Sequence, residues 1–190
     1  MKVDFRKTTF VTSCTSVADH PKDGLPAVLF CGRTNVGKST LINALTGKKL
    51  AFSSKKAGKT RLLNYFLVDS KFYLVDSPGY GSTSYATQNT IFFAGMMEDY
   101  AKDKSLKSIA ILLDLRRELG KDDLQFLEYL KGTGKRIVCI LTKADQMNQS
   151  QLHKAKTVAA TLGFDEVLVS DQKPKSLEQI RGTLVRSLEG

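Results

Sequence analysis

Short apolar runs alternate with amphipathic stretches along most of this 190-residue chain. The apolar runs have the length of β-strands and lie at 27–31, 109–113, 137–141 and 167–169. Stretches with the period of an amphipathic helix lie between and after them, at 39–45, 90–103, 122–131, 150–162 and 175–188. Continuous apolar strands separated by helices are typical of a parallel sheet that is covered on both faces. The pattern therefore predicts an α/β fold with helices on both faces of a mostly parallel sheet.

Two further apolar runs predict one antiparallel hairpin in this sheet. Residues 62–68 and 72–75 are separated by 69–71 (Asp-Ser-Lys), which is short enough for a tight connection. A first strand is possible at 5–14. No internal repeat or linker is visible, so we expect a single domain over residues 1–190.

The composition is that of a globular protein with an excess of positive charge. Hydrophobic residues make up 42% of the chain and charged residues 25%, which is enough apolar surface for a core. The formal net charge is +10, and residues 1–61 alone hold twelve basic and three acidic side chains. Nucleic acid and an anionic membrane are candidate partners, because attraction to phosphate acts at long range.

Membrane, secreted and zinc-dependent classes are not expected. The longest apolar stretches, such as Ile109–Leu113, are far shorter than the ~20 residues that span a bilayer, and the first residues do not form an apolar signal segment. Cys31 and Cys139 lie inside apolar runs, which predicts buried, reduced thiols. His20 and His153 lie outside any motif and are expected at the surface. The chain is expected to be cytoplasmic.

The strongest chemical signal is the motif G-x-x-x-x-G-K-[ST] at residues 32–40. It follows a predicted strand and opens a predicted helix, so its glycines can wrap the backbone N–H groups around a phosphate at a helix N-terminus. Lys38 is expected to reach the β- and γ-phosphates and Ser39 to bind Mg²⁺. A chance glycine-rich turn is the alternative, and the flanking elements disfavour it. The predicted phosphate-binding residues are Gly32, Arg33, Thr34, Asn35, Val36, Gly37, Lys38, Ser39 and Thr40.

A second signal, Asp-Ser-Pro-Gly, follows the second hairpin strand. Asp76 is expected to hold Mg²⁺ through water, and the Gly79 N–H to approach the γ-phosphate. Ser77 and Pro78 complete this candidate loop. The four residue types are common in turns, so the placement after a strand carries the prediction.

A third signal, Thr-Lys-Ala-Asp, follows the strand at 137–141 and concerns the base. The Asp145 carboxylate can accept hydrogen bonds from the N1 and N2 positions of guanine, which adenine cannot donate. Lys143 is expected to lay its aliphatic stem over the base. A solvated loop is the alternative for this motif alone. The full candidate set for the base is Thr142, Lys143, Ala144, Asp145, Leu168, Val169 and Ser170, the last through its backbone N–H to guanine O6.

The connection before the hairpin supplies a less specific candidate for a metal ligand. Thr60 is placed to give Mg²⁺ a second hydroxyl when a γ-phosphate is present, although an exposed loop threonine is the simpler alternative. Its neighbours Gly58, Lys59, Arg61 and Leu62 are included in the predicted nucleotide site.

Taken in order, these motifs resemble the EngB (YihA/YsxC) family of ribosome-biogenesis GTP-binding proteins, within the translation-factor-type P-loop GTPases. The likeness covers nearly the whole chain, through NVGKSTLIN, AGKTRLLNYF, DSPGYG and the segment before TKAD. It implies the three-layer sandwich of a P-loop GTPase, GTP or GDP and Mg²⁺ as ligands, and GTP hydrolysis as a switch in assembly of the large ribosomal subunit. Its implied partner is the large subunit or its precursor, with rRNA and ribosomal proteins.

The resemblance also implies catalytic roles for Lys38, Thr60, Gly79 and Asn35. Tyr80 follows Gly79, where many GTPases carry a glutamine that orients the attacking water, so slow intrinsic hydrolysis is expected. Asn35 matches an asparagine that helps to hold K⁺ in several relatives, which makes K⁺ a further candidate cofactor. The alternative is that Asn35 only closes its loop through backbone hydrogen bonds.

The basic excess is interpreted as an RNA-binding surface near the nucleotide. No acidic residue interrupts the basic residues of this segment, which are Lys48, Lys49, Lys55, Lys56, Lys59 and Arg61. We expect a monomer with neither DNA nor a membrane as partner. Two other functions stay open: a basic RNA-binding module in which nucleotide is structural, and an ATP-using P-loop kinase, which the Thr-Lys-Ala-Asp motif disfavours.

Overall fold

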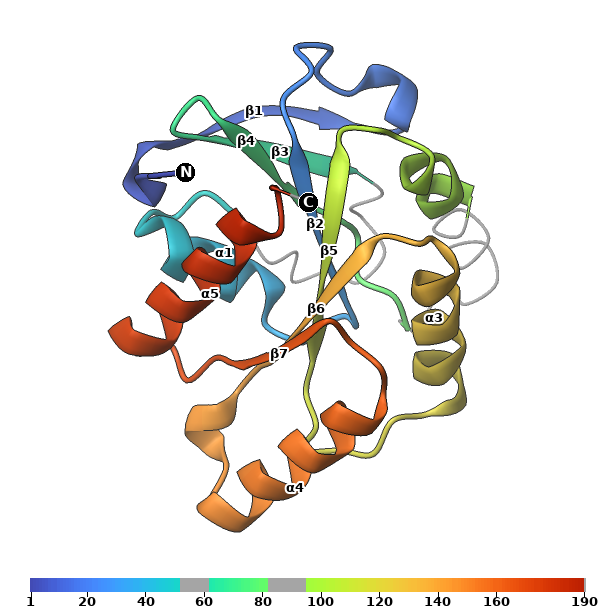
Figure 1. Ribbon diagram of the computed structural model, residues 1–190, viewed down its shortest axis with the longest axis vertical. Helices are drawn as coiled ribbons and strands as arrows, with labels where there is room; N and C mark the ends of the chain where they lie inside the picture. Colours follow the sequence, from blue (N-terminus) through green and yellow to red (C-terminus); the bar gives the residue numbers. More distant parts are fainter. Residues whose placement is uncertain (52–61, 82–94, 190) are drawn as a thin grey trace.

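A seven-stranded sheet runs through the middle of the computed structural model, which describes residues 1–51, 62–81 and 95–189 (Figure 1). Its strand order is β1-β3-β4-β2-β5-β6-β7. Strand β3 is antiparallel to both of its neighbours, and the pairs from β4 through β7 are parallel. The strands are β1 (Thr8–Cys14), β2 (Ala27–Gly32), β3 (Leu63–Val68), β4 (Phe72–Asp76), β5 (Leu106–Leu113), β6 (Arg136–Leu141) and β7 (Glu166–Val169). The predicted mostly parallel sheet with one antiparallel hairpin strand is confirmed.

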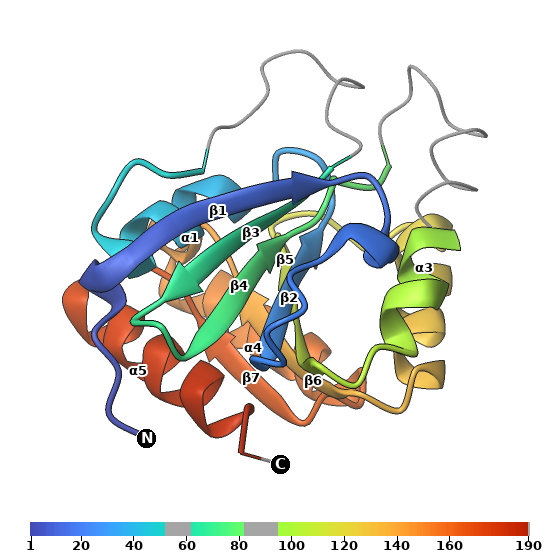
Figure 2. The same cartoon turned by 90° about the horizontal axis from the view of Figure 1, so that it is seen from above.

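Helices cover both faces of the sheet. Helices α1 (Lys38–Thr46) and α5 (Pro174–Arg186) pack on one face, while α3 (Lys121–Gly132), α4 (Gln149–Thr161) and the helical residues 95–101 pack on the other. Figure 2 shows α1 and α5 on one side of the strands and α3 on the opposite side. Three short 3₁₀ turns complete the described elements: η1 (Phe5–Lys7), η2 (Val17–Asp19) and η4 (Ala144–Gln146). The result is the predicted three-layer sandwich.

Strand β2 shows why its sequence is apolar without alternation. Val28 and Phe30 pack with α1 and α5, whereas Leu29 and Cys31 face the cluster under α3 and α4. Both faces of β2 are therefore buried, and each of these side chains has a hydrophobic environment. The thiols of Cys31 and Cys139 are free and buried as predicted, and burial raises both pKa values, that of Cys139 to about 12.

Two element boundaries differ from the sequence expectation for local reasons. Residues 5–7 form a 3₁₀ turn instead of extending the first strand, because the Asp4 carboxylate accepts the Arg6 N–H at 3.1 Å. Strand β5 begins at Leu106, earlier than predicted, and includes the fully buried Ser108. The hydroxyl groups of Ser108 and Ser187 lie 2.7 Å apart, so this polar side chain is satisfied inside the core.

The remaining expectations have mixed outcomes. The hairpin turn is confirmed, with φ angles of 48° at Asp69 and 54° at Ser70, a conformation that short polar residues tolerate. The expected helix at 90–103 lies partly outside the described residues.

His153 is exposed as expected, but His20 is half-buried, with Nδ1 3.2 Å from an Asp103 carboxylate oxygen. No helix in the described ranges combines the length and apolar composition needed to cross a membrane.

Candidate nucleotide-binding site

The loops that carry the sequence motifs meet at one edge of the sheet. Strands β2, β4, β5, β6 and β7 lead into residues 33–37, 77–81, 114–120, 142–148 and 170–173. All five of these strands are consecutive parallel neighbours in the sheet, so their carboxyl ends point the same way. Ligands of open α/β sheets bind at this edge.

The phosphate loop has the close packing and backbone geometry that its glycines predict. A Cβ on Gly32 would lie 2.9 Å from a methyl group of Val36 and 3.0 Å from the Leu112 carbonyl oxygen. Gly37 has a φ of +104° and directly precedes α1, and Asn35 has a φ of 64°. The loop thus presents the N-terminal N–H groups of α1 toward the site, as phosphate binding requires.

Lys38 and Asp76 form an ion pair at the floor of this site. The Lys38 Nζ lies 2.5 Å from Oδ1 of Asp76, and their side chains are only 12% and 8% exposed. The Lys38 ammonium is suited to bind a phosphate oxygen, and the Asp76 carboxylate is suited to bind a cation. Phosphate with its counter-cation can therefore bind across the pair without leaving either charge unmatched.

The donor set is suited to a hard cation such as Mg²⁺. Ser39, half-buried in the first turn of α1, and the mostly buried Asp76 both supply oxygen atoms. Within residues 1–51, 62–81 and 95–189, no three or more His, Cys, Asp or Glu side chains cluster as a metal site. Mg²⁺ commonly takes few protein ligands and completes its shell with phosphate and water. The third predicted metal ligand, Thr60, lies outside the described residues, as do Gly58, Lys59 and Arg61.

The segment after β4 is hydrogen-bonded to the phosphate loop. The Tyr80 N–H donates to the Gly32 carbonyl at 3.2 Å, and the Thr34 N–H donates to the Tyr80 carbonyl at 2.9 Å. A Cβ on Gly79 would lie 2.9 Å from both Cα and Oγ1 of Thr34. Ser77 anchors the start of the segment, because its N–H and Oγ both bond to the Phe30 carbonyl. A displacement of Gly79 must therefore disturb the phosphate loop.

The Tyr80 side chain is directed toward α3. Its ring packs against Phe126, with centroids 4.4 Å apart, and its hydroxyl donates to Oδ1 of Asp123 at 3.1 Å. Burial, and then the Asp123 charge, raise the pKa of Tyr80 far above its ordinary value, so the phenol stays protonated as a donor. The Tyr80 side chain is thus held by two residues of α3.

Asp123 joins several segments around this site. Its fully buried carboxylate accepts from Arg117 at 3.0 Å and from the Gly120 N–H at 2.9 Å, and lies 3.6 Å from the Arg33 guanidinium. Burial on its own would raise the pKa of Asp123, but the hydrogen bonds from Arg117 and Gly120 lower it overall, so the group is ionised. The sequence alone does not single out Asp123, because an aspartate in a first helical turn is ordinarily exposed to solvent.

The Thr-Lys-Ala-Asp loop is tied to the phosphate loop. The Thr142 hydroxyl donates to the Val36 carbonyl at 2.8 Å, and the Lys143 ammonium donates to the Asn35 carbonyl at 3.0 Å. Asp145 is exposed at the rim, where a ligand can reach its carboxylate. The three motifs predicted from spacing therefore form one continuous site.

Asp114, which sequence analysis also missed, orients this loop from the end of β5. Its carboxylate lies 3.2 Å from the Lys143 ammonium and accepts two hydrogen bonds from the Arg116 side chain. The Arg116 hydrogen bonds, and then Lys143, lower the pKa of Asp114 to about 2. A carboxylate directly after a central parallel strand is the signal that could have identified it.

The base-site candidates at the end of β7 make contacts within the protein. The Ser170 N–H donates to the Leu141 carbonyl at 2.8 Å. The bond from this N–H to guanine O6 stays a prediction. Leu168 and Val169 pack against the two hydrophobic clusters of the core. The β7 loop still borders the site, since the Ser170 carbonyl accepts the Ala144 N–H at 3.3 Å.

Comparison with known proteins identifies the family. A family model described as 50S ribosome-binding GTPase matches residues 27–143. A probable GTP-binding protein EngB of Clostridium perfringens is 38% identical over 162 residues, which is 84% of this chain and 82% of that protein. Another, of Mesoplasma florum, is 37% identical and covers 97% of this chain and 98% of its own length. The chain belongs to the EngB family of GTP-binding proteins.

Solved structures of this class share the fold of the EngB chain. A crystal structure of a probable GTP-binding protein engB superimposes with a TM-score of 0.67 at 20% identity, covering 86% of this chain and 98% of that one. Aquifex aeolicus Era bound to GDP·AlF₄⁻ gives a TM-score of 0.64 at 20% identity, over 86% of this chain and 57% of Era. With its family membership and site, the EngB chain is a GTPase that binds guanine nucleotide.

The basic residues predicted to meet RNA are only partly described in this EngB protein. Lys55, Lys56, Lys59 and Arg61 lie outside the described residues. Lys49 is exposed, but the Lys48 ammonium donates to the Thr8 carbonyl at 2.9 Å and so fastens α1 to the edge strand β1. Lys48 is therefore engaged within the protein, in contrast to the expectation that all these side chains are free for RNA.

Proposed function

We propose that this EngB-family GTPase is a nucleotide-operated switch in assembly of the large ribosomal subunit. The observation that carries the proposal is the pair of backbone hydrogen bonds between Tyr80 and the phosphate loop, at 3.2 and 2.9 Å. Gain or loss of a γ-phosphate at Gly79 changes this pairing, and a small local change is amplified where packed segments have two arrangements. The match to a 50S ribosome-binding GTPase family model supports the ribosomal partner.

We assign Mg²⁺ to Ser39, Asp76 and Thr60. When bound, the cation neutralises charge on the phosphate oxygens. Lys38 supplies a second positive charge to the same oxygens, and its position is held by Asp76 at 2.5 Å. The Gly79 N–H lies on the segment paired with the phosphate loop, where it can donate to the terminal phosphate. These groups bind and orient the nucleotide without a side-chain general base.

Slow intrinsic hydrolysis follows from the direction of Tyr80. Its ring is packed on Phe126 and its hydroxyl is bonded to Asp123, so the side chain next to Gly79 does not orient water. We propose that K⁺ near the exposed Asn35 side chain stabilises transition-state charge. The Asn35 carbonyl also accepts from Lys143, in accord with the loop-closing alternative. Hydrolysis rates in KCl and NaCl at equal ionic strength decide between them, and equal rates reject the K⁺ role.

The proposed partner is the large ribosomal subunit or its precursor, bound by a monomeric cytoplasmic protein through rRNA. The test is sedimentation of lysate with GTP, GDP or no nucleotide at low salt. Cosedimentation with large-subunit particles that is strongest with GTP supports the switch. Failure to follow these particles under every condition contradicts the ribosomal assignment.

The alternative function, an RNA-binding module with a structural nucleotide, draws on the charge of residues 1–61. Lys38→Ala and Asp76→Ala separate the two. If GTP operates the switch, both variants lose assembly function and the GTP-dependent part of binding, while retaining the RNA affinity of the nucleotide-free protein. If the nucleotide is only structural, they retain assembly function as long as they remain folded, which circular dichroism establishes.

A further inference from the structure

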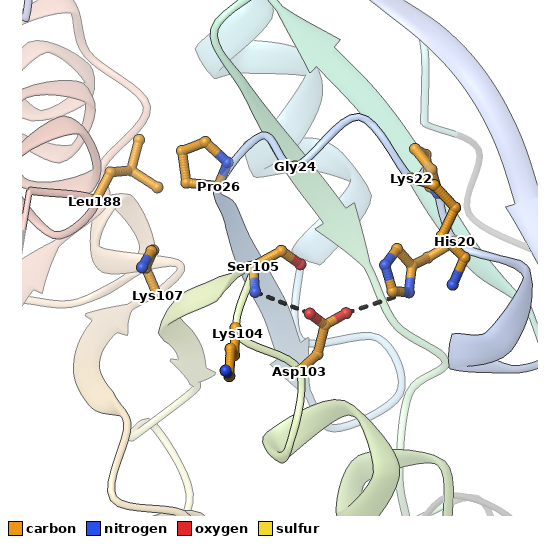
Figure 3. A pocket seen from close by; sticks show the side chains of 10 residues that line it. His20, Lys22, Gly24, Pro26, Asp103, Lys104, Ser105, Lys107 and Leu188 are labelled. Carbon is orange, nitrogen blue, oxygen red and sulfur yellow. Dashed lines mark hydrogen bonds and ion pairs between the residues drawn. The ribbon is translucent and has the colours of Figure 1, made fainter.

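A hollow of about 420 Å³ lies at the opposite end of the central strands from the nucleotide loops (Figure 3). It is formed by the loop at 20–26, the turn at 103–107 and Leu188 after α5. Strands β2 and β5 begin here, and the Ala27 N–H donates to the Ser105 carbonyl at 2.8 Å. Since the motif loops follow the carboxyl ends of the same strands, the hollow is separate from the nucleotide site.

The acidic side chain in the lining, Asp103, contacts two other residues of the hollow. One Asp103 carboxylate oxygen lies 3.2 Å from Nδ1 of His20, and the other accepts the Ser105 N–H at 2.8 Å (Figure 3). The Asp103 side chain is only 11% exposed. One negative charge therefore lies among the lysines of the lining, and its side chain is mostly covered.

Three exposed lysines from two places in the chain line the hollow: Lys22 in the loop at 20–26, and Lys104 and Lys107 in the turn at 103–107. None of them forms an ion pair or a side-chain hydrogen bond with another residue in the described part of the chain. Nearby acidic groups are engaged elsewhere: Asp23 accepts the Tyr73 hydroxyl at 2.7 Å, and Glu189 pairs with the N-terminal ammonium at 2.7 Å. The hollow therefore carries a net positive potential.

The walls of the hollow are held by contacts within the protein. The Lys135 ammonium donates to the carbonyls of Asp103 at 3.0 Å and Leu106 at 2.9 Å, which fixes the turn and adds a fourth positive charge behind it. Pro21 and Pro26 restrict the facing loop. Positive charges on a preorganised surface bind an anion with little ordering cost.

We infer that this basic hollow binds consecutive phosphates of an RNA backbone, an inference that rests on the proposed ribosomal function. Its lining lacks a helix N-terminus and a glycine-rich cradle, so it is not built to enclose one phosphate group. Its exposed ammonium groups instead come from two facing segments, the loop at 20–26 and the turn at 103–107, which suits an RNA strand that crosses the surface between them. The one aliphatic side chain longer than proline in the lining, Leu188, is 7% exposed, so no apolar group is available to enter a lipid surface.

The test compares Lys104→Gln/Lys107→Gln with the matched double variant Lys154→Gln/Lys156→Gln. The control residues are exposed lysines of α4, so both variants lose the same charge. Binding to purified large-subunit rRNA is measured over a range of KCl concentrations, together with GTP affinity. We expect the hollow variant to lose roughly tenfold in RNA affinity and to flatten the salt dependence by ~1–2 in log–log slope, at ~0.7–0.9 per phosphate contact. GTP affinity should not change in either variant.

The outcomes separate this inference from the proposed function. If wild type binds the rRNA and the hollow variant matches the α4 control, the hollow is not an RNA site, and the ribosomal function is unaffected. If wild type binds neither rRNA nor large-subunit particles in any nucleotide state, both proposals fail. Calorimetric titration with inorganic phosphate is a third measurement, in addition to rRNA binding and GTP affinity. A binding signal lost only in the hollow variant, without loss of rRNA affinity, identifies a small-anion site and overturns the RNA inference.

Discussion

The Tyr80 hydroxyl donates a 3.1 Å hydrogen bond to the carboxylate of Asp123, which is fully buried in the first turn of α3. The same carboxylate holds Arg117 and lies 3.6 Å from the phosphate-loop residue Arg33. The segment that follows Asp76 is thus connected to α3 as well as to the phosphate loop. A movement of Tyr80 therefore has to change its contacts with α3 as well as those with the phosphate loop.

Replacement of Asp123 should destabilise the fold. Asp123→Asn keeps the volume but removes the negative charge between two guanidinium groups, and hydrogen bonds to charged groups contribute about 1.5–3 kcal/mol each. We expect the free energy of unfolding, measured by urea titration, to fall by about 2–3 kcal/mol. Asp122→Asn is the control, since the neighbouring carboxylate is exposed and should cost less than ~0.5 kcal/mol. Equal effects would show that Asp123 has no special role.

Addition of a methyl group at Gly79 should impair hydrolysis. The new Cβ of Gly79→Ala lies 2.9 Å from the backbone of Thr34, so one of the two paired segments must shift. We expect a destabilisation of about 1–3 kcal/mol from overpacking and a larger fall in the rate of GTP hydrolysis. Gly132→Ala is a matched control in α3, where a Cβ meets no atom within 4 Å and alanine favours the helix. Unaltered hydrolysis in Gly79→Ala contradicts the close contact.

The Lys38–Asp76 pair predicts non-additive variants. Lys38→Ala leaves the 8%-exposed Asp76 carboxylate without its ammonium partner, which should cost about 3 kcal/mol of stability in the nucleotide-free protein. The double variant Lys38→Ala/Asp76→Ala removes both charges and should recover part of that loss, but not nucleotide affinity. Thermal unfolding and nucleotide titration measure the two quantities. Additive losses of stability would show that the charges do not interact.

Asp145 should decide which base is bound. Asp145→Ala removes the acceptor for the guanine N1 and N2 groups, and sites built on such hydrogen bonds can discriminate by ~10⁴-fold or more. We expect GTP affinity to fall by at least ~100-fold and the preference over ATP to be largely lost. Competition of unlabelled GTP or ATP against labelled GTP measures both the affinity for GTP and the preference for GTP over ATP. Retention of the full guanine preference would place base recognition elsewhere.

Asp114 should make stability depend on acid pH. Its folded-state pKa is lowered from 3.8 to about 2 by Arg116 and Lys143, so its stabilising contribution is present above pH 3.8 and is lost as pH falls toward 2. The difference in Tm between wild type and Asp114→Asn should therefore be largest near neutrality and shrink through this window. A difference that stays constant down to pH 2 would show that ionisation of Asp114 does not contribute.

Much of the fold and all three nucleotide motifs could be read from the sequence because their signals are local. Strand β2, the glycines of residues 32–37 and helix α1 are adjacent in the chain, so hydrophobic pattern and spacing are sufficient to predict a phosphate loop. The base loop likewise follows β6 directly. Predictions failed where a local hydrogen bond redirected the backbone, as at Asp4, or satisfied a buried polar side chain, as at Ser108.

Tertiary structure alone decided which groups serve as partners. Tyr80 and Asp123 are 43 residues apart, and Thr142 reaches Val36 over 106 residues. The Ser170 N–H is used by β6, although its position after a strand suggested a ligand. The physical reason is the separation along the chain over which each kind of interaction acts. Periodicity and turn chemistry act over a few residues, whereas the partner of a buried carboxylate or N–H depends on how distant elements pack. The sequence determined where the nucleotide loops lie, and packing determined what holds them.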